Sequence, residues 1–455
     1  MSATVLATDP ARWQAAAMDW RRWAAAAGFW AARIQRCAAR LRDLWSGACA
    51  EAVVAALTAI VHRLTLLRLG CWAADQALSE FAAALTRARR TGASAAAADQ
   101  THAGTLRRLF PAPPPHPTPT PFCTATAPQV HAWWQSLSPA QRDDVTARQP
   151  DWLGALDGVP ASARDRANRL LLDNTRASGG IRLPADLAAR LDAESGPRAY
   201  LMGIDPAGDG RAVVALGDPD QAAAVVTHVP GMTADLASYR GELTRADRLA
   251  VRAAELAPDR PASAVMWLGY DAPDDLVEAA GRAPAAAGAD RLRRFQEGLR
   301  VTHEGEPARQ TLLGHSYGSL VVGTAAAQPG LAADSVVFVG SPGVGVDHAG
   351  DLRVPRSEVY AMTAFSDPVQ WAAVAPDALA RDLLVSRAIP GGAAHAFLRP
   401  EDELFFGRNP ADPAFGARSV ASQPDAGHVG YWDEGRPALD ALARIVTGRA
   451  DVTPR

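Results

Sequence analysis

The stretch that decides the fold is Thr311-Leu312-Leu313-Gly314-His315-Ser316-Tyr317-Gly318-Ser319-Leu320-Val321-Val322-Gly323-Thr324-Ala325-Ala326. An apolar run leads into a G-x-S-x-G pentapeptide, and a second apolar run of helical length follows. Strand, sharp turn and helix in this order are the context of a nucleophile elbow, which exposes a serine hydroxyl above the edge of a sheet. Glycines on both sides remove side chains that would clash at the turn. The stretch therefore predicts Ser316 as a nucleophile.

Outward from this stretch, short β-rich runs alternate with helical runs from residue 198 to the C-terminal region. Such alternation predicts a mostly parallel sheet of about eight strands with helices on both faces. The turn-rich run 205–210 favours an antiparallel first pair. The predicted strands are 200–204, 212–216, 223–229, 264–268, 310–313, 335–339, 359–364 and 417–421. The predicted helices are 233–255, 274–281 with 291–300, 319–327 and 437–447, preceded by one over 162–172.

A serine nucleophile needs a base, and the base needs an acid that orients it. We expect the base to be His428, which lies among small residues between the last predicted strand and the C-terminal helix. His395 lies in an apolar, strand-like setting that favours a structural role, and His348 lies in a loop soon after the sixth predicted strand. Both stay as alternatives.

The expected acid is Asp367, which follows a predicted strand and lies between Ser316 and His428 in the chain. A carboxylate at the C-terminal edge of a parallel strand is well placed to meet the base. Pro368 follows directly, so Asp367 would serve equally well as a helix N-cap, and both roles are compatible. Asp347 and Asp377 are the alternatives.

An oxyanion hole needs two backbone N–H groups. One is expected from Tyr317, immediately after the nucleophile. The other is expected from the loop after the third strand, where Pro230 has no N–H, so Met232 is the first choice and Gly231 the second. For substrate binding we select a set that flanks the predicted triad or follows the fourth strand: His315, Asp271 and Val429.

These motifs together resemble an actinobacterial α/β-hydrolase family that is catalogued as a domain of unknown function. The resemblance extends over about 300 residues and implies an α/β-hydrolase fold with a Ser316–Asp367–His428 triad. It implies no particular substrate. Val429 departs from the small polar residue expected there, which alters the pocket rim. The matching segments are Trp133-Trp134, Gly158-Val159-Pro160, Arg164-Asp165, Asn168-Arg169, Val229-Pro230-Gly231-Met232, 267–273, 314–319, Gly340-Ser341-Pro342-Gly343, Asp367-Pro368-Val369 and 428–433.

Residues 11–91 contain no proline and repeat apolar residues with the spacing of a heptad, which predicts an antiparallel pair of helices that reverses at Trp45-Ser46-Gly47. This segment resembles the WXG-type hairpins of ESX (type VII) secretion substrates. Those substrates carry a Tyr-x-x-x-Asp/Glu signal after the second helix, whereas the first tyrosine here is Tyr200. The alternative is a helical hairpin that packs on the next domain, forms a homodimer or binds a helical partner.

The proline-rich run 111–121 favours extended polyproline II and marks a domain boundary. We therefore predict a helical hairpin over 1–108, a linker over 109–128 and an α/β-hydrolase domain over 129–455. Within that domain, 129–197 would be a helical lead-in and 198–450 the sheet core.

The composition of the chain argues against several classes of protein. The net charge is −3, which argues against a nucleic-acid binder. The four cysteines form no CxxC pair and are expected to be buried thiols, and neither a metal nor an organic cofactor is implied. Charged residues interrupt every apolar run near the N-terminus, so we expect no cleaved signal peptide and no transmembrane segment. The expected location is cytoplasmic, or outside the cell by a type VII-like route.

The residues thus predict a serine hydrolase that cleaves a small-molecule acyl ester, in the manner of an esterase or lipase, through an acyl-enzyme. One alternative keeps the elbow but changes the acceptor, as in acyl transfer or peroxide-dependent chemistry. The other is a secretion-associated effector whose hairpin binds a partner.

Overall fold

The computed structural model describes residues 9–91, 124–176, 181, 183–193, 196–275, 278–371 and 406–449. Backbone contacts divide the chain into two units. The helical unit comprises Met1–Cys123, Ala132–Gly154 and Arg166–Arg182, and the sheet unit comprises Thr124–His131, Ala155–Asp165 and Leu183–Arg455. Most of the predicted linker lies outside the described residues, and the predicted domain boundaries stay predictions.

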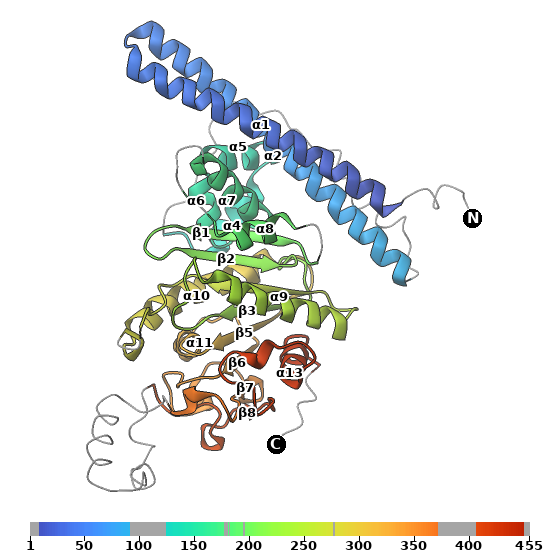
Figure 1. The fold of residues 1–455 in the computed structure, drawn as a ribbon, viewed down its shortest axis with the longest axis vertical. Coiled ribbons are helices and arrows are strands. Elements are labelled where there is room, and N and C mark those ends of the chain that lie inside the picture. Colours follow the sequence, from blue (N-terminus) through green and yellow to red (C-terminus); the bar gives the residue numbers. More distant parts are fainter. Residues whose placement is uncertain are drawn as a thin grey trace. The chain divides into compact units, whose positions relative to one another are not determined.

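All eight predicted strands are present, and they form one sheet (Figure 1). The spatial order is β1-β2-β4-β3-β5-β6-β7-β8. Strand β2 runs antiparallel to both of its neighbours, and every later pair is parallel. The strands are β1 Ala199–Asp205, β2 Arg211–Leu216, β3 Ala224–Val229, β4 Ala262–Leu268, β5 Arg309–His315, β6 Ser335–Val339, β7 Val359–Met362 and β8 Arg418–Ser419.

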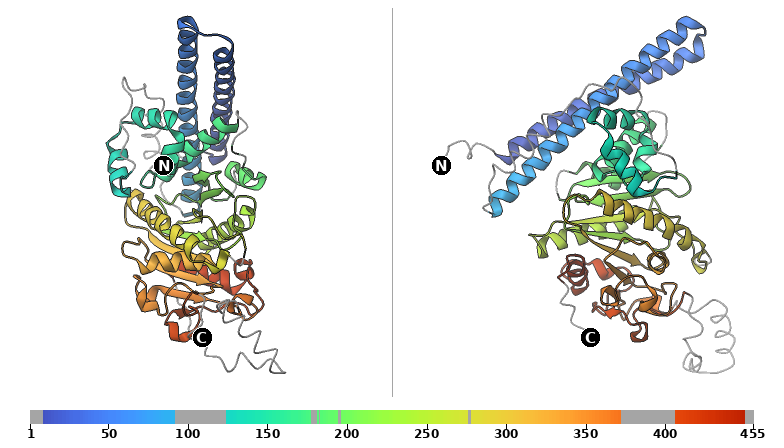
Figure 2. Two further views of the ribbon diagram at one scale, coloured as in Figure 1. Left: turned by 90° about the vertical axis from the view of Figure 1, so that its left-hand side faces the viewer. Right: turned by 180° about the vertical axis from the view of Figure 1, so that it is seen from behind.

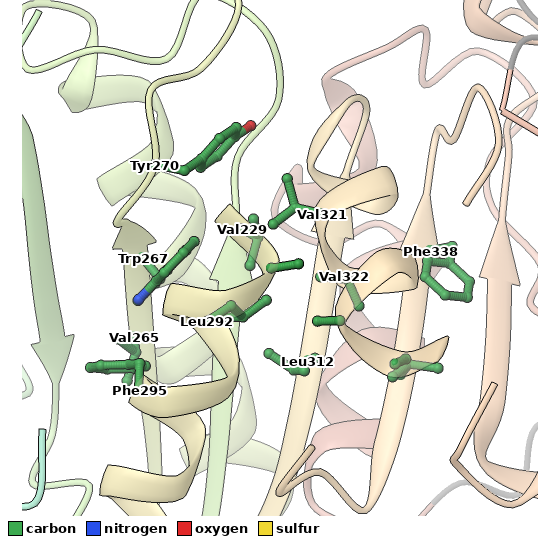
Figure 3. Close-up of a cluster of buried hydrophobic side chains, with 14 of the residues drawn as sticks. Val229, Val265, Trp267, Tyr270, Leu292, Phe295, Leu312, Val321, Val322 and Phe338 are labelled. Atoms are coloured by element: carbon green, nitrogen blue, oxygen red, sulfur yellow. The ribbon is translucent and has the colours of Figure 1, made fainter. Parts of the chain in front are cut away.

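Helices cover both faces of the sheet, as predicted (Figure 2). On one face, α10 (Ala283–Thr302) and α11 (Gly318–Ala327) pack against each other. Alternate strand residues such as Val265 and Trp267 join them in one buried apolar cluster, because successive strand side chains point to opposite faces (Figure 3). Helices α9 (Tyr239–Leu256) and α13 (Pro437–Val446) pack against each other, and residues of α9 and α13 are absent from that cluster.

Two predicted helices differ from the structure. The helix predicted from residue 233 begins at Tyr239, since Thr233 has φ +63° and cannot continue a right-handed helix. Of the helix predicted over 274–281, the described residues form only the 3-10 turn Glu278–Ala280, which ends at Gly281.

The helical unit contains two long antiparallel helices that pack along each other, α1 (Pro10–Leu44) and α2 (Ala48–Thr91) (Figure 1). The chain reverses between them, and Gly47 takes φ +107°, which a residue with a side chain rarely adopts. The predicted hairpin and the position of its turn are therefore present. The rest of the region before the sheet forms α4 (Ala127–Ser136), α5 (Pro139–Arg148), α6 (Pro150–Ala155), α7 (Ala161–Arg176) and α8 (Ala185–Asp192).

The seam between α1 and α2 differs from the prediction. Trp23 and Trp30 fit the heptad spacing that predicted the hairpin and were expected in its seam, yet they are 66% and 53% exposed. The buried positions of α1 are instead alanines at seven-residue spacing, with Ala27 beside them. Small side chains allow two helices to approach closely, and the bulky neighbours are then turned outward. The repeating alanines are Ala17, Ala24, Ala31 and Ala38.

The cysteine prediction for this unit needs revision, and the expected absence of a transmembrane segment stays a prediction. Cys71 is buried as expected, but Cys37 and Cys49 are exposed because both lie away from the seam, and Cys123 lies outside the described residues. Among the described helices, the stretch Ala48–Arg89 is long and apolar enough by length and composition to cross a membrane, with a mean hydropathy of 1.6 in its most apolar window. A helix of a soluble protein also passes this test, so the finding is weak evidence against the predicted absence of such a segment.

Candidate active site

The turn between β5 and α11 holds Ser316 in a strained conformation. Its φ is +53°, and among the described residues the one other non-glycine with positive φ is Thr233. The Ser316 amide donates to the carbonyl of Val339, which fixes the turn against the end of β6 at 3.0 Å. Strain of this kind persists only where the surroundings impose it, and it is frequent at reactive positions.

The two glycines of the pentapeptide are required by close packing. A Cβ on Gly318 would lie 2.2 Å from the carbonyl oxygen of Val229, and one on Gly314 would lie 2.6 Å from the Cα of Ser319. Both distances are far below van der Waals contact. The turn can thus lie directly against the end of β3, and this closeness brings the loop after β3 to Ser316.

An acid–base pair lies at the ends of neighbouring strands. Asp367 follows β7 and is fully buried, and its Oδ1 accepts a hydrogen bond from His428 Nδ1 at 2.8 Å. The second oxygen, Oδ2, accepts from the hydroxyl of Tyr431 at 2.5 Å. The Val369 amide donates to Oδ1 at 2.9 Å, and the Ala364 amide donates to the Tyr431 hydroxyl at 2.9 Å. Both oxygens of Asp367 are therefore held in place.

These contacts keep Asp367 ionised. Burial by itself raises the pKa of Asp367, but the hydrogen bonds from His428, Tyr431 and the Val369 amide outweigh it and hold the pKa below its ordinary value. Burial and the bond to Asp367 raise the pKa of Tyr431, so its hydroxyl remains a donor. A charged carboxylate fixes the Nδ1 proton of His428 and leaves the Nε2 lone pair of the ring for a second partner.

Strand order brings Ser316 to the same sheet edge as this pair. Strands β5, β6 and β7 are parallel neighbours, so their C-terminal ends meet there. Gly340, which follows β6 with φ +52°, lies against the pair: a Cβ on it would be 2.6 Å from Asp367 Oδ2 and 3.3 Å from the His428 ring. Among the described residues, no hydrogen bond reaches the Ser316 hydroxyl, and in the absence of a substrate catalytic hydrogen bonds are often not yet formed.

His315 lies behind the base. It is 3% exposed, and its Nε2 lies 2.8 Å from the backbone oxygen of His428. Burial lowers the pKa of His315 to about 3, so the ring is neutral and Nε2–H donates to that carbonyl. The substrate contact predicted for His315 stays a prediction, and in the structure its buried ring supports the backbone of His428.

The loop after β3 lies beside Ser316, as the oxyanion prediction requires. A Cβ on Gly231 would be 2.6 Å from the Ser316 Cβ and 3.1 Å from its Oγ. The backbone N–H groups of Gly231, Met232 and Tyr317 donate to no described residue. Three polarised N–H groups near one hydroxyl are thus left without an internal acceptor.

Two hydrogen bonds hold the loop after β3, one from a tyrosine and one from a threonine. The Tyr270 hydroxyl donates to the Pro230 carbonyl at 2.7 Å, and the Thr233 amide donates to the Pro273 carbonyl at 2.8 Å. Thr233 is β-branched, and its φ of +63° is a clear backbone outlier. Thr233 directly follows Met232, so its strained backbone and its bond to Pro273 fix the chain beside the Met232 amide.

The other predicted residues within the described part of the chain are exposed. Asp271 is exposed on the loop after β4, close to Gly208 of the β1–β2 turn. Val429 is 55% exposed next to the base. Asp347 accepts from the Arg408 amide, and His348 is exposed with its Nδ1 near the Ala414 carbonyl. The remaining alternatives, Asp377 and His395, lie outside the described residues.

Sequence reasoning missed the supporting residues. The sequence analysis includes Tyr431 only within the 428–433 segment and gives it no role. Its position three residues after the base could have suggested a role beside the acid. Tyr270 and Thr233 gave no signal, since their roles depend on loop geometry. Within the described part of the chain, no cluster of three or more His, Cys, Asp or Glu residues is suited to a metal ion.

Comparisons with known proteins place this site in a family. A family model described as "Alpha/beta hydrolase" matches residues 205–376. The uncharacterized protein Rv2079 of Mycobacterium tuberculosis is 30% identical over 375 residues, which cover 71% of this chain and 56% of that protein. The uncharacterized protein Mb0988c of Mycobacterium bovis is 36% identical over 235 residues, which cover 50% of this chain and 82% of that protein. The chain thus spans little more than half the length of the first of these relatives.

Among solved structures, a dienelactone hydrolase from Anabaena variabilis aligns over 57% of this chain and all of its own, with 15% identity and a TM-score of 0.30. The S-formylglutathione hydrolase FrmB from Staphylococcus aureus aligns over 59% of this chain and all of its own, with 11% identity and a TM-score of 0.28. These scores are low, and the assignment follows from the sequence matches together with the strand order. The chain belongs to the alpha/beta hydrolase family.

Proposed function

We propose that the protein is a serine hydrolase that cleaves carboxylic esters through an acyl-enzyme. The observation that carries this proposal is the strained Ser316 at the end of β5, with the Asp367–His428 pair at the same sheet edge. A serine held on such a turn, a histidine with one nitrogen fixed by a buried carboxylate, and unpaired amides nearby are the parts that acyl transfer requires.

Each residue then has one role. Ser316 Oγ attacks the acyl carbon while His428 Nε2 accepts the hydroxyl proton, and the same nitrogen returns the proton to the leaving alcohol. Asp367 orients the imidazole and stabilises its charged form. A water molecule, deprotonated by His428, then attacks the acyl-enzyme and releases the acid with Ser316 restored.

The oxyanion is stabilised by backbone N–H groups. The Tyr317 amide lies at the start of α11, and the Met232 or Gly231 amide comes from the loop held by Tyr270. Because none of these three N–H groups donates to a described residue, they are available when negative charge develops on the acyl oxygen.

The surroundings of the base favour an apolar acyl or alkyl group. In the described part of the sheet unit, the large exposed apolar side chains are Val251, Phe365 and Val429. Phe365 lies two residues before the acid, and Val429 directly follows the base. A rim of this kind binds hydrocarbon in preference to charged groups.

The experiment is labelling of the purified protein with a fluorescent fluorophosphonate, which reports an activated serine without assuming a substrate. We expect the wild type to react and Ser316→Ala and His428→Ala to lose labelling by about a thousandfold or more. Two matched controls, Ser357→Ala and His348→Ala, replace an exposed serine and an exposed histidine and should label like the wild type.

Wild-type protein that remains folded by circular dichroism but does not label would contradict the proposal. If labelling occurs, a series of p-nitrophenyl esters of increasing acyl length tests the apolar rim. A preference for the acetyl ester that Val429→Ser leaves unchanged would refute the role given to that side chain.

A further inference from the structure

The tip of the hairpin, defined as residues 23–67, carries its large apolar side chains on the outside. Eight of them are between 38% and 84% exposed, whereas the buried positions of α1 in this region are alanines. The eight are Trp23, Phe29, Trp30, Leu44, Trp45, Val53, Ile60 and Leu67.

On each helix these side chains form a stripe. In α1, Trp23 and Trp30 are seven residues apart, and in α2 the spacing of Val53, Ile60 and Leu67 is also seven. Residues seven apart lie nearly above one another on an α-helix. The apolar surface is therefore continuous along each helix rather than scattered.

Arginines share the same stripes. In α1, Arg33 and Arg40 are seven residues apart, and Arg33 lies over the rings of Phe29 and Trp30 at 5.9 Å and 5.6 Å. In α2, Arg63 lies between Ile60 and Leu67 in the sequence. On α1, aromatic and cationic groups therefore lie side by side.

The tip has an excess of positive charge that the chain itself does not neutralise. It contains five arginines against Asp43 and Glu51, so its net charge is +3, whereas the whole chain has −3. All five arginines are exposed, and none of them forms an ion pair with a residue that the structure describes. They are Arg33, Arg36, Arg40, Arg42 and Arg63.

We propose that the hairpin tip is a peripheral docking surface for an anionic lipid bilayer. Tryptophan, phenylalanine and leucine insert at the boundary between headgroups and acyl chains, while arginines bind the phosphates above it. Charge complementarity distinguishes this occupant from a second copy of the chain, which would bring five more arginines to the same surface. An acidic protein helix would also satisfy the charge, and binding to lipid vesicles distinguishes the bilayer from it.

The test is co-sedimentation of the full-length protein with vesicles. We expect binding to phosphatidylcholine vesicles that contain phosphatidylglycerol, at least tenfold weaker binding to phosphatidylcholine alone, and release when the ionic strength rises from about 0.1 M to about 1 M. The triple variant Arg33→Gln, Arg36→Gln, Arg40→Gln should bind more weakly by about fivefold for each arginine removed.

Matched controls separate this surface from general charge. The triple variant Arg240→Gln, Arg353→Gln, Arg444→Gln removes three exposed arginines of the sheet unit and should bind like the wild type. Trp23→Ser with Trp30→Ser should weaken binding at the lower ionic strength, and Val251→Ser should not. Circular dichroism and fluorophosphonate labelling show whether each variant is folded.

Three results would overturn the proposal. The first is absence of binding to the phosphatidylglycerol vesicles by folded wild type. The second is equal, salt-insensitive binding to both kinds of vesicle. The third is a dimer in sedimentation equilibrium that the two tryptophan substitutions abolish, which would assign the surface to a second copy. Binding to an acidic helical peptide but not to vesicles would assign it to a protein partner instead.

Discussion

The sheet unit and the hairpin place their large apolar residues in opposite ways. In the sheet unit, Trp267, Phe338 and Leu312 are buried, and the smallest residues lie where two elements approach closely. At the hairpin tip, alanines form the seam while tryptophans face outward. Both regions repeat apolar residues at regular spacing, but only in the sheet unit are the largest of these residues the buried ones. Apolar periodicity therefore identifies a helix or strand. The size of the side chains on its apolar face shows whether that face is buried by other parts of the same chain.

The largest expected effect tests this comparison directly. Phe338→Ala, in the middle of the sheet, should lower the free energy of unfolding by about 3–5 kcal/mol, because a fully buried ring leaves a cavity. Trp23→Ala removes a larger side chain from the hairpin but should change the free energy of unfolding by no more than about 0.5 kcal/mol, because that side chain is exposed. Urea denaturation of both variants measures the difference. Equal losses would mean that the tip is packed against something in the isolated protein.

A smaller effect is expected at Tyr431, a buried residue of the sheet unit that supports the acid. Tyr431→Phe removes one hydrogen bond from a charged carboxylate, worth about 1.5–3 kcal/mol. The lowered pKa of Asp367 contributes stability that is present above the ordinary carboxyl pKa and is lost as pH falls through the lowered value. The variant should therefore lose stability at a higher pH than the wild type.

The control for this prediction is Tyr239→Phe, which removes a buried hydroxyl that has no hydrogen-bond partner among the described residues. Its loss of stability at low pH should coincide with that of the wild type. An unchanged loss of stability in Tyr431→Phe, measured by urea denaturation from pH 3 upward, would show that the tyrosine does not influence Asp367.

The smallest effect concerns the backbone of the elbow. Ser316→Gly should raise the free energy of unfolding by about 1 kcal/mol, since glycine adopts a positive φ without the steric cost that serine bears. Ser316→Ala, which keeps the cost, should leave stability close to that of the wild type. Thermal denaturation of the pair measures the difference, and a glycine variant less stable than the alanine variant would contradict the interpretation of strain.

Much of the sheet unit could be predicted from sequence because its signals are local. Each strand is a short β-rich run between turns, and the serine pentapeptide occurs between a strand and a helix. The pairing of Asp367 with His428 followed from where parallel strands end. The roles of the triad residues remain proposals, but their positions at one edge were accessible to reasoning from residues 314–318 outward.

The parts that escaped prediction depend on contacts between distant segments. Nothing in the sequence around Tyr270 reveals that its hydroxyl meets Pro230, forty residues away. The seam of the hairpin escaped prediction for another reason: Trp23 and Ala24 are adjacent, and apolar periodicity alone does not decide which of the two stripes forms the seam. Thr233 contradicts its own backbone preference, and local propensity cannot indicate an exception of that kind.

The alanine seam has a consequence for how the hairpin is aligned. The seam of α1 repeats the same small side chain every seven residues, at Ala17, Ala24, Ala31 and Ala38. None of these side chains is long enough to require one particular partner on α2. Sliding by one repeat would bring alanine back to alanine, so the seam does not by itself fix the alignment of the helices. Alignment is set instead by contacts that a shift would break: the Gly47 turn, the ion pair of Arg21 with Asp75 at 2.8 Å, and the edge-to-face contact of Trp13 with Phe81. Seven residues added to each helix on the turn side of Arg21 and Asp75 would leave the last two contacts in place.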